Sequence, residues 1–164
     1  VLTKVDLASR ESLAKLKQGL AKYQPKALVV ESVHHPVGFY NIKDPDKFLG
    51  LKLLDRKSKV ALLSGIGDPD SFCRLALQLG LEVGLELKFP DHHQYTSGEV
   101  ELIISRVKGS GIKLIITTEK DAARFTDEVV SLFSGIDIIV LRVELEILKH
   151  EKEFFGRLLS LYSF

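Results

Sequence analysis

From residue 60 onward, apolar runs of strand length alternate with segments that have a helical pattern. This alternation limits the possible folds more than any other feature of the sequence. Continuous apolar runs are typical of strands that are buried on both faces of a sheet. The order strand, helix, strand predicts βαβ units, and therefore an α/β/α sandwich with a mainly parallel sheet. The segments expected to be strands are 60–63, 81–89, 113–117 and 136–145.

Local signals mark where the helices should begin. Asp68 precedes Pro69, an order typical of a helix start, and Thr96 stands three residues before Glu99, the spacing of a capping box. Thr118 likewise stands three residues before Asp121, which is also the spacing of a helix cap. The expected helices are 9–23, 69–79, 96–107, 118–133 and 149–161.

The segment before residue 60 has a weaker pattern. Residues 27–33 are expected to form a strand that His34, His35 and Pro36 interrupt, and residues 37–40 resume it. We interpret the mixed stretch 41–59 as a joint between two units, with turn chemistry at 44–45.

Composition excludes several classes of protein. The 23 Lys and Arg residues nearly balance the 22 Asp and Glu residues, so no nucleic-acid partner is expected. The single Cys73 forms no internal disulfide and favours a reducing compartment. No apolar run approaches the roughly 20 residues that span a bilayer, so we expect a soluble chain. Methionine is absent and the chain begins with Val1, which indicates a fragment of a longer protein.

Polar residues follow three of the expected strands. In open parallel sheets, ligands bind at these carboxyl ends of the strands. The glycine turn 65–68 has two interpretations: a phosphate cradle at a helix N-terminus, or a tight turn with an acidic helix cap. Asp91 beside His92 offers a carboxylate and an imidazole for proton transfer, and the alternative is an exposed polar loop. The histidine pairs 34–35 and 92–93 lack metal-ligand spacing, so no metal site is expected.

The third strand end is Thr117-Thr118-Glu119-Lys120-Asp121, and helix capping explains most of it. Lys120 opposes the helix dipole in the first turn, which indicates a partner such as a neighbouring carboxylate or a phosphate. Near the start of the chain, Lys4 and Asp6 lie in a Thr-Lys-x-Asp sequence similar to the base-recognition element of P-loop GTPases. No phosphate loop ending in Lys-Ser or Lys-Thr occurs in the chain.

Taken in order, three motifs resemble the carboxy-terminal half of the tetraacyldisaccharide 4'-kinases, the lipid A 4'-kinases of Gram-negative bacteria. They are Ser-Gly-Ile-Gly-Asp-Pro from Ser64, Phe-Pro-Asp-His-His from Phe89, and Thr-Thr-Glu-Lys-Asp from Thr117. The resemblance covers nearly the whole chain and is strongest from residue 60 to residue 125.

The resemblance implies transfer of the ATP γ-phosphate to the 4'-hydroxyl of tetraacyldisaccharide 1-phosphate, a lipid A precursor, at the cytoplasmic face of the inner membrane. It implies that ATP and Mg²⁺ are bound mainly by an amino-terminal P-loop domain that also contacts the membrane and holds an aspartate base. His92 would pair with that base, with Asp91 beside it. Thr117, Thr118, Lys120, Asp121, Lys4 and Asp6 are further candidates for the nucleotide or substrate site.

The resemblance also implies a division of the chain. Residues 1–25 would be the tail of the P-loop domain, and 26–58 a linker strand and joint. Residues 59–140 would form the carboxy-terminal α/β unit, and 141–164 a return linker strand and a closing helix. This fragment alone is expected to be inactive as a kinase. Two alternatives remain open: a fragment of a GTPase-like regulator, and a non-catalytic α/β interaction module.

Overall fold

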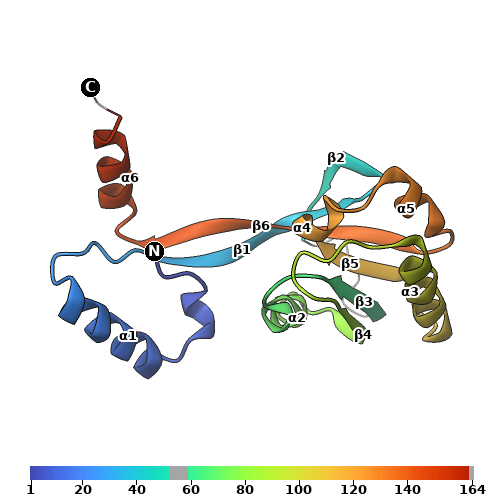
Figure 1. Cartoon of the computed structure of the whole chain (residues 1–164), viewed down its shortest axis with the longest axis horizontal. Coiled ribbons are helices and arrows are strands. Elements are labelled where there is room, and N and C mark those ends of the chain that lie inside the picture. Colours follow the sequence, from blue (N-terminus) through green and yellow to red (C-terminus); the bar gives the residue numbers. More distant parts are fainter. Residues whose placement is uncertain (52–58, 163–164) are drawn as a thin grey trace. The chain divides into compact units, whose positions relative to one another are not determined.

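A computed structural model describes residues 1–51 and 59–162 (Figure 1). The chain divides into two units, which are described separately. The first combines Val1–His35 with Val143–Phe164, and the second is Pro36–Arg142. Strands β1 (Glu31–Asn41) and β6 (Asp137–Lys149) contribute residues to both.

The described strands form one mostly parallel sheet, in the order β2-β1-β6-β5-β3-β4. Strand β3 pairs in parallel with β4 and β5, and β5 pairs in parallel with β6, whereas β1 and β2 are antiparallel. The predicted α/β fold is confirmed. Strands β1 and β6, which include the residues expected to form the linker strands, are neighbours within this same sheet. The remaining strands are β2 (Asp44–Leu49), β3 (Lys59–Ser64), β4 (Glu82–Lys88) and β5 (Leu114–Thr118).

The helices of the second unit begin where their capping residues indicate. Asp68 caps α2 (Pro69–Gln78), and Thr96 and Glu99 form the predicted capping box of α3 (Ser97–Gly109). The expected helix 118–133 is instead two short helices, α4 (Glu119–Ala122) and α5 (Asp127–Leu132). They are separate because the Thr126 hydroxyl accepts a hydrogen bond from the Val129 amide and starts a new helix.

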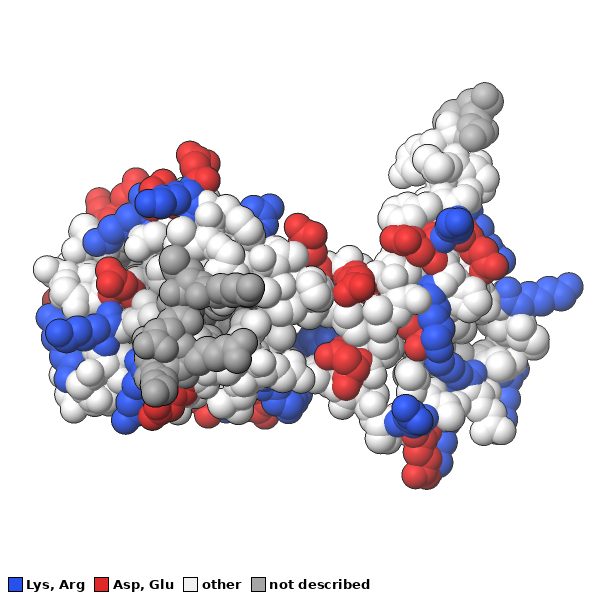
Figure 2. Space-filling view, turned by 180° about the vertical axis from the view of Figure 1, so that it is seen from behind, with Lys and Arg blue, Asp and Glu red and all other residues white. Residues whose placement is uncertain are grey.

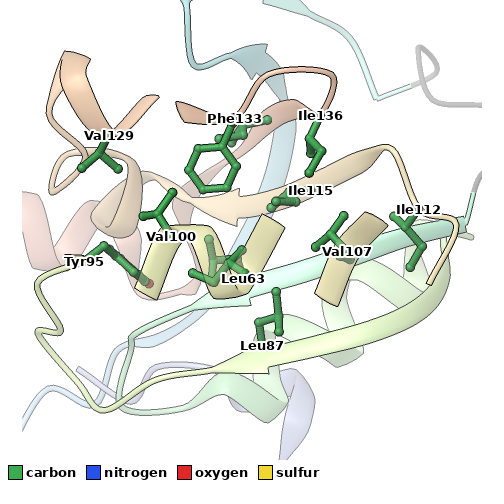
Figure 3. Packing of buried hydrophobic residues seen from close by; sticks show 13 residues of the cluster. Leu63, Leu87, Tyr95, Val100, Val107, Ile112, Ile115, Val129, Phe133 and Ile136 are labelled. Carbon is green, nitrogen blue, oxygen red and sulfur yellow. The ribbon is translucent and has the colours of Figure 1, made fainter. Parts of the chain in front are cut away.

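The main core lies between the sheet and α3 with α5. Valines of α3 and Phe133, just after α5, pack on alternate residues of β3, β5 and β6, and Figure 3 shows Val100, Val107 and Phe133 around Leu63 and Ile115. The side chains that point to the opposite face, such as those of residues 62, 116 and 139, are buried too. A parallel sheet covered on both faces needs such continuous apolar strands.

The region before β3 departs from the sequence expectation. Strand β1 runs through His34, His35 and Pro36 without interruption, and Asp44-Pro45 lies in β2 and not in a turn. Part of the expected joint, 52–58, lies outside the described residues.

In the first unit, the predicted helix at 9–23 is α1 (Arg10–Tyr23), capped by Ser9. The unit also contains the short 3₁₀ helix η1 (Val5–Leu7) and the closing helix α6 (Glu151–Ser160). Glu31 is buried and accepts hydrogen bonds from Lys17 of α1, and Lys149 lies 3.3 Å from its carboxylate. These lysines lower the pKa of Glu31.

Candidate functional site

The three polar motifs that follow β3, β4 and β5 meet at the carboxyl ends of these strands. The Phe89 amide donates to the Ser64 carbonyl (2.8 Å), and the His92 amide donates to the Gly65 carbonyl (3.2 Å). The Gly65 amide in turn donates to Asp121 Oδ1 (2.9 Å). The glycine turn therefore contacts both other motifs, as the parallel sheet predicts.

Asp121 is the centre of this network and is fully buried. Its Oδ1 atom accepts hydrogen bonds from the Gly65 amide, from the Tyr95 hydroxyl (3.1 Å) and from Arg124 Nη1 (3.1 Å), and Oδ2 accepts from the Thr118 hydroxyl (2.7 Å). A buried carboxylate needs such donors and a countercharge, because desolvation penalises an unpaired charge. Asp121 thus fixes the loops around the site and is not exposed to a ligand.

Tyr95 and Arg124 are the members of this network that the sequence did not single out as site residues. Burial, followed by the nearby charge of Asp121, raises the pKa of Tyr95 well above its usual range, so the phenol remains a hydrogen-bond donor. Arg124 also donates from Nη1 to the Gly65 carbonyl (2.8 Å). The only sequence signal for Arg124 is its position three residues after Asp121, the spacing of neighbouring side chains in the expected helix, although Arg124 lies just after the end of α4.

Asp91 and His92 lie beside the glycine turn, and the His92 ring is exposed. The His92 backbone adopts the left-handed conformation (φ 60°), and its amide also lies 3.0 Å from Asp91 Oδ1. The ring is 82% exposed, with Nε2 3.7 Å from Asp91 Oδ2 and Nδ1 3.4 Å from Arg124 Nη2. The predicted carboxylate and imidazole are therefore adjacent, and the imidazole is open to a ligand.

The neighbouring His93 has a different environment. Its ring stacks on Phe89 at a centroid distance of 4.7 Å and meets Tyr95 edge-on, and its side chain is only 19% exposed. Nε2 lies 3.1 Å from Glu99 Oε1 but has no hydrogen-bond partner among the described residues. His93 therefore packs the loop against α3, whereas His92 faces outward.

The glycine turn is a close-packed helix start. A Cβ atom on Gly65 would lie 3.1 Å from the Pro90 carbonyl oxygen, and one on Gly67 would lie 3.3 Å from Asp91 Oδ2. Asp68 accepts a hydrogen bond from the Ser71 amide (3.0 Å) and caps α2 with a negative charge. These contacts favour the tight turn over the phosphate cradle, because an anion would meet the carboxylates of Asp68 and Asp91.

The remaining candidates are distributed over the chain. Thr117 is buried, and its hydroxyl donates to the Leu63 carbonyl (2.8 Å), which ties β5 to β3. Lys120 is exposed on α4, and the carboxylates on either side of it face arginines: Glu119 lies 3.7 Å from Arg142, and Asp121 pairs with Arg124.

Lys4 and Asp6 belong to the first unit, around η1, whereas the other candidates belong to the second. Among residues 1–51 and 59–162, no three His, Cys, Asp or Glu side chains are grouped to hold a metal ion. Within the same residues no helix is both long and apolar enough to cross a membrane. Figure 2 shows basic and acidic side chains interspersed on one face of the described chain.

The fold and the three converging loops are those of an open-sheet α/β protein, in which the carboxyl ends of the strands are the usual place for a ligand. A model of the tetraacyldisaccharide-1-P 4'-kinase family matches residues 5–163. The chain belongs to this family.

Curated relatives agree with this assignment. A tetraacyldisaccharide 4'-kinase of Anaeromyxobacter dehalogenans strain 2CP-C is 35% identical over 150 residues, which cover 90% of this chain and 38% of the relative. A tetraacyldisaccharide 4'-kinase of Halothermothrix orenii is 31% identical over 163 residues, which cover 90% of this chain and 41% of the relative. The chain thus spans about two fifths of the length of these relatives.

A solved structure is also similar: LpxK from Aquifex aeolicus, described as an "apo" form in complex with ATP. It is 19% identical, with a TM-score of 0.49 over 97% of this chain and 50% of that chain. The family assignment rests on the sequence matches, and these do not favour the GTPase-like regulator or the non-catalytic module.

Proposed function

We propose that this chain is the carboxy-terminal part of a kinase that transfers the ATP γ-phosphate to the 4'-hydroxyl of tetraacyldisaccharide 1-phosphate. Family membership supports the reaction class, and the relatives carry the name of that kinase. The observation that carries the role of this chain is the exposed His92 imidazole beside Asp91, held at the carboxyl edge of the sheet by hydrogen bonds to its backbone amide.

In this proposal His92 acts on a carboxylate base. The base removes the proton of the 4'-hydroxyl while the oxygen attacks the γ-phosphorus and the bond to the β-phosphate oxygen breaks. An imidazole N–H directed at that carboxylate orients it and stabilises its charge. Phosphoryl transfer depends mainly on such positioning and on charge stabilisation. The aspartate base would lie in the amino-terminal part of the kinase.

The described residues of this chain do not fit the triphosphate or Mg²⁺. The sequence lacks a phosphate loop, the glycine turn carries carboxylates, and no group of metal-ligating side chains is present among residues 1–51 and 59–162. We therefore propose that ATP and Mg²⁺ are bound by the amino-terminal part of the kinase. The contact with the cytoplasmic face of the inner membrane is implied by the family resemblance alone, and we propose the same part for it. The lipid A disaccharide precursor would reach His92 from that side.

A chimeric enzyme tests the proposal. This chain replaces the matching 150 residues of the Anaeromyxobacter dehalogenans relative, and phosphorylation of tetraacyldisaccharide 1-phosphate is measured. We expect the chimera to be active and this chain alone to be inactive. An inactive but folded chimera, or kinase activity of this chain alone, would contradict the proposed division of the site.

The His92→Asn variant tests the role of the imidazole in the chimera. Asparagine tolerates the left-handed conformation of residue 92, so the loop is preserved while the imidazole is lost. We expect kcat to fall roughly 100-fold with little change in KM for ATP, because an orienting group acts mainly in the transition state. Gln94→Ala, in an exposed position of the same loop, is the control, and equal effects of the two variants would remove the catalytic role of His92.

A further inference from the structure

Arg124 connects the buried part of the site to its exposed part. Its side chain is only 13% exposed, between the fully buried Asp121 carboxylate and the His92 ring, which is 82% exposed. Nη1 donates to Asp121 Oδ1 and to the Gly65 carbonyl, and Nη2 lies 3.4 Å from His92 Nδ1. One guanidinium therefore contacts the buried Asp121 carboxylate with one nitrogen and the exposed His92 imidazole with the other.

The Gly65 carbonyl strengthens this connection. It accepts hydrogen bonds from Arg124 Nη1 (2.8 Å) and from the His92 amide (3.2 Å), so the backbone and the ring of His92 are both held from the end of β3. A guanidinium is planar and carries its donors in a fixed fork, so fixing one nitrogen also fixes the direction of the other.

We propose that Arg124 is a positioning residue for His92. Its Nη2 group donates to Nδ1, so the imidazole accepts at Nδ1 and presents its proton on Nε2, the nitrogen near Asp91 Oδ2. Arginine can only donate, which excludes a proton on Nδ1 in this contact. The inference rests on the proposed function for its catalytic meaning, whereas the order of the ring is testable in this chain alone.

The competing explanation is that Arg124 only neutralises Asp121. Arg124→Lys separates the two roles, because an ammonium group keeps the positive charge near Asp121 but lacks the planar fork that reaches the carboxylate and the ring together. Arg142→Lys is the matched control, since Arg142 lies 3.7 Å from Glu119, which belongs to α4 as Asp121 does.

The first measurement is the order of the His92 ring in this chain by ¹³C relaxation, with the signal assigned through its loss in His92→Gln. We expect a ring order parameter near that of rigid backbone, about 0.85, which falls below about 0.6 in Arg124→Lys and is unchanged in Arg142→Lys. A ring that is equally ordered with and without Arg124 overturns the proposal.

The second measurement is a double-mutant cycle for kcat in the chimera. Arg124→Lys should lower kcat about tenfold, the lower end of what partners that orient functional histidines contribute at metal sites. In the His92→Asn background the same change should have almost no effect on kcat, because its target is gone. Equal effects in both backgrounds overturn the positioning role. If the chimera is inactive, the proposed function fails, and the ring-order measurement alone decides the inference about Arg124.

Discussion

The hydrogen bond between Tyr95 and Asp121 allows a quantitative test of the buried network. Tyr95→Phe removes one hydroxyl and leaves the ring, which packs against Phe89 and Phe125 at centroid distances of 5.3 Å and 4.6 Å. A hydrogen bond to a charged group contributes about 1.5–3 kcal/mol. Phenylalanine has no hydroxyl that must be desolvated on folding, and this partly offsets the lost hydrogen bond. The expected loss of unfolding free energy is therefore near the lower end of this range, about 1.5 kcal/mol. Tyr23→Phe is the control, because Tyr23 is 90% exposed.

Asp121→Asn is the second arm of this test. The amide oxygen can still accept from the Gly65 backbone, but Arg124 then faces a neutral group without its countercharge. Removing one partner of a buried ion pair costs about 3–5 kcal/mol, and because the new amide keeps part of the hydrogen bonding we expect about 3 kcal/mol. This is a large share of the roughly 5–15 kcal/mol that stabilises a typical domain.

The two changes should be strongly coupled. In the Asp121→Asn background the Tyr95 hydroxyl donates only to a neutral oxygen, so Tyr95→Phe should cost about 1 kcal/mol less than in the unmodified chain. Urea unfolding followed by circular dichroism gives the free energies, and amide exchange in β3 and β5 assigns them to the second unit. A cost of Tyr95→Phe that matches Tyr23→Phe, or costs that simply add, would refute the account of Asp121 as the shared acceptor.

Two further variants test the packing of the glycine turn and the buried acid of the first unit. Gly65→Ala places a methyl group 3.1 Å from a backbone oxygen and should lower the free energy of unfolding in urea by about 1–3 kcal/mol. Gly98→Ala, where a Cβ atom would have nothing within 4 Å, is the control and should be neutral or slightly stabilising. Equal effects of the two variants would contradict the close packing of the turn. The pKa of Glu31 is lowered, first by the hydrogen bond from Lys17, so its contribution is complete above about pH 4.5 and is lost as the pH falls through the lowered pKa. Glu31→Gln should therefore reduce the urea midpoint at pH 7 more than at pH 3. Glu11→Gln, at an exposed residue, is the control and should change the midpoint little at either pH. An effect of Glu31→Gln that is independent of pH would show that the charge of Glu31 does not stabilise the first unit.

The helix starts could be predicted because their signals are local. The capping box of Thr96 and Glu99 lies within four residues, and its hydrogen bonds form in the helix itself. The break after α4 was missed because Thr126 acts as a second cap inside a segment whose apolar spacing suits one continuous helix. Strand β2 was missed because most of its residues are exposed and its pairing with β1 depends on residues outside the segment.

The site was predictable as a region but not as a network. The parallel sheet implies that residues after β3, β4 and β5 come together, and the Gly65 and Asp121 contact confirms this. Cap spacing correctly placed Asp121 at a helix start, since its amide does donate to the Thr118 hydroxyl (3.2 Å). The burial of its carboxylate depends on Tyr95 from a different loop, and no local pattern encodes that contact.

Adjacent histidines in one loop have opposite environments, and the backbone explains why. A left-handed conformation at a residue other than glycine costs on the order of 1 kcal/mol, and at His92 the hydrogen bonds of its amide to Asp91 and Gly65 offset this cost. The reversal at His92 directs its ring to solvent and leaves the next ring, that of His93, packed on Phe89. An extended residue at position 92 would not produce this reversal. Within this loop, the strained backbone at His92 therefore accompanies an imidazole that is exposed while its amide is held by hydrogen bonds, as the proposed role of His92 requires.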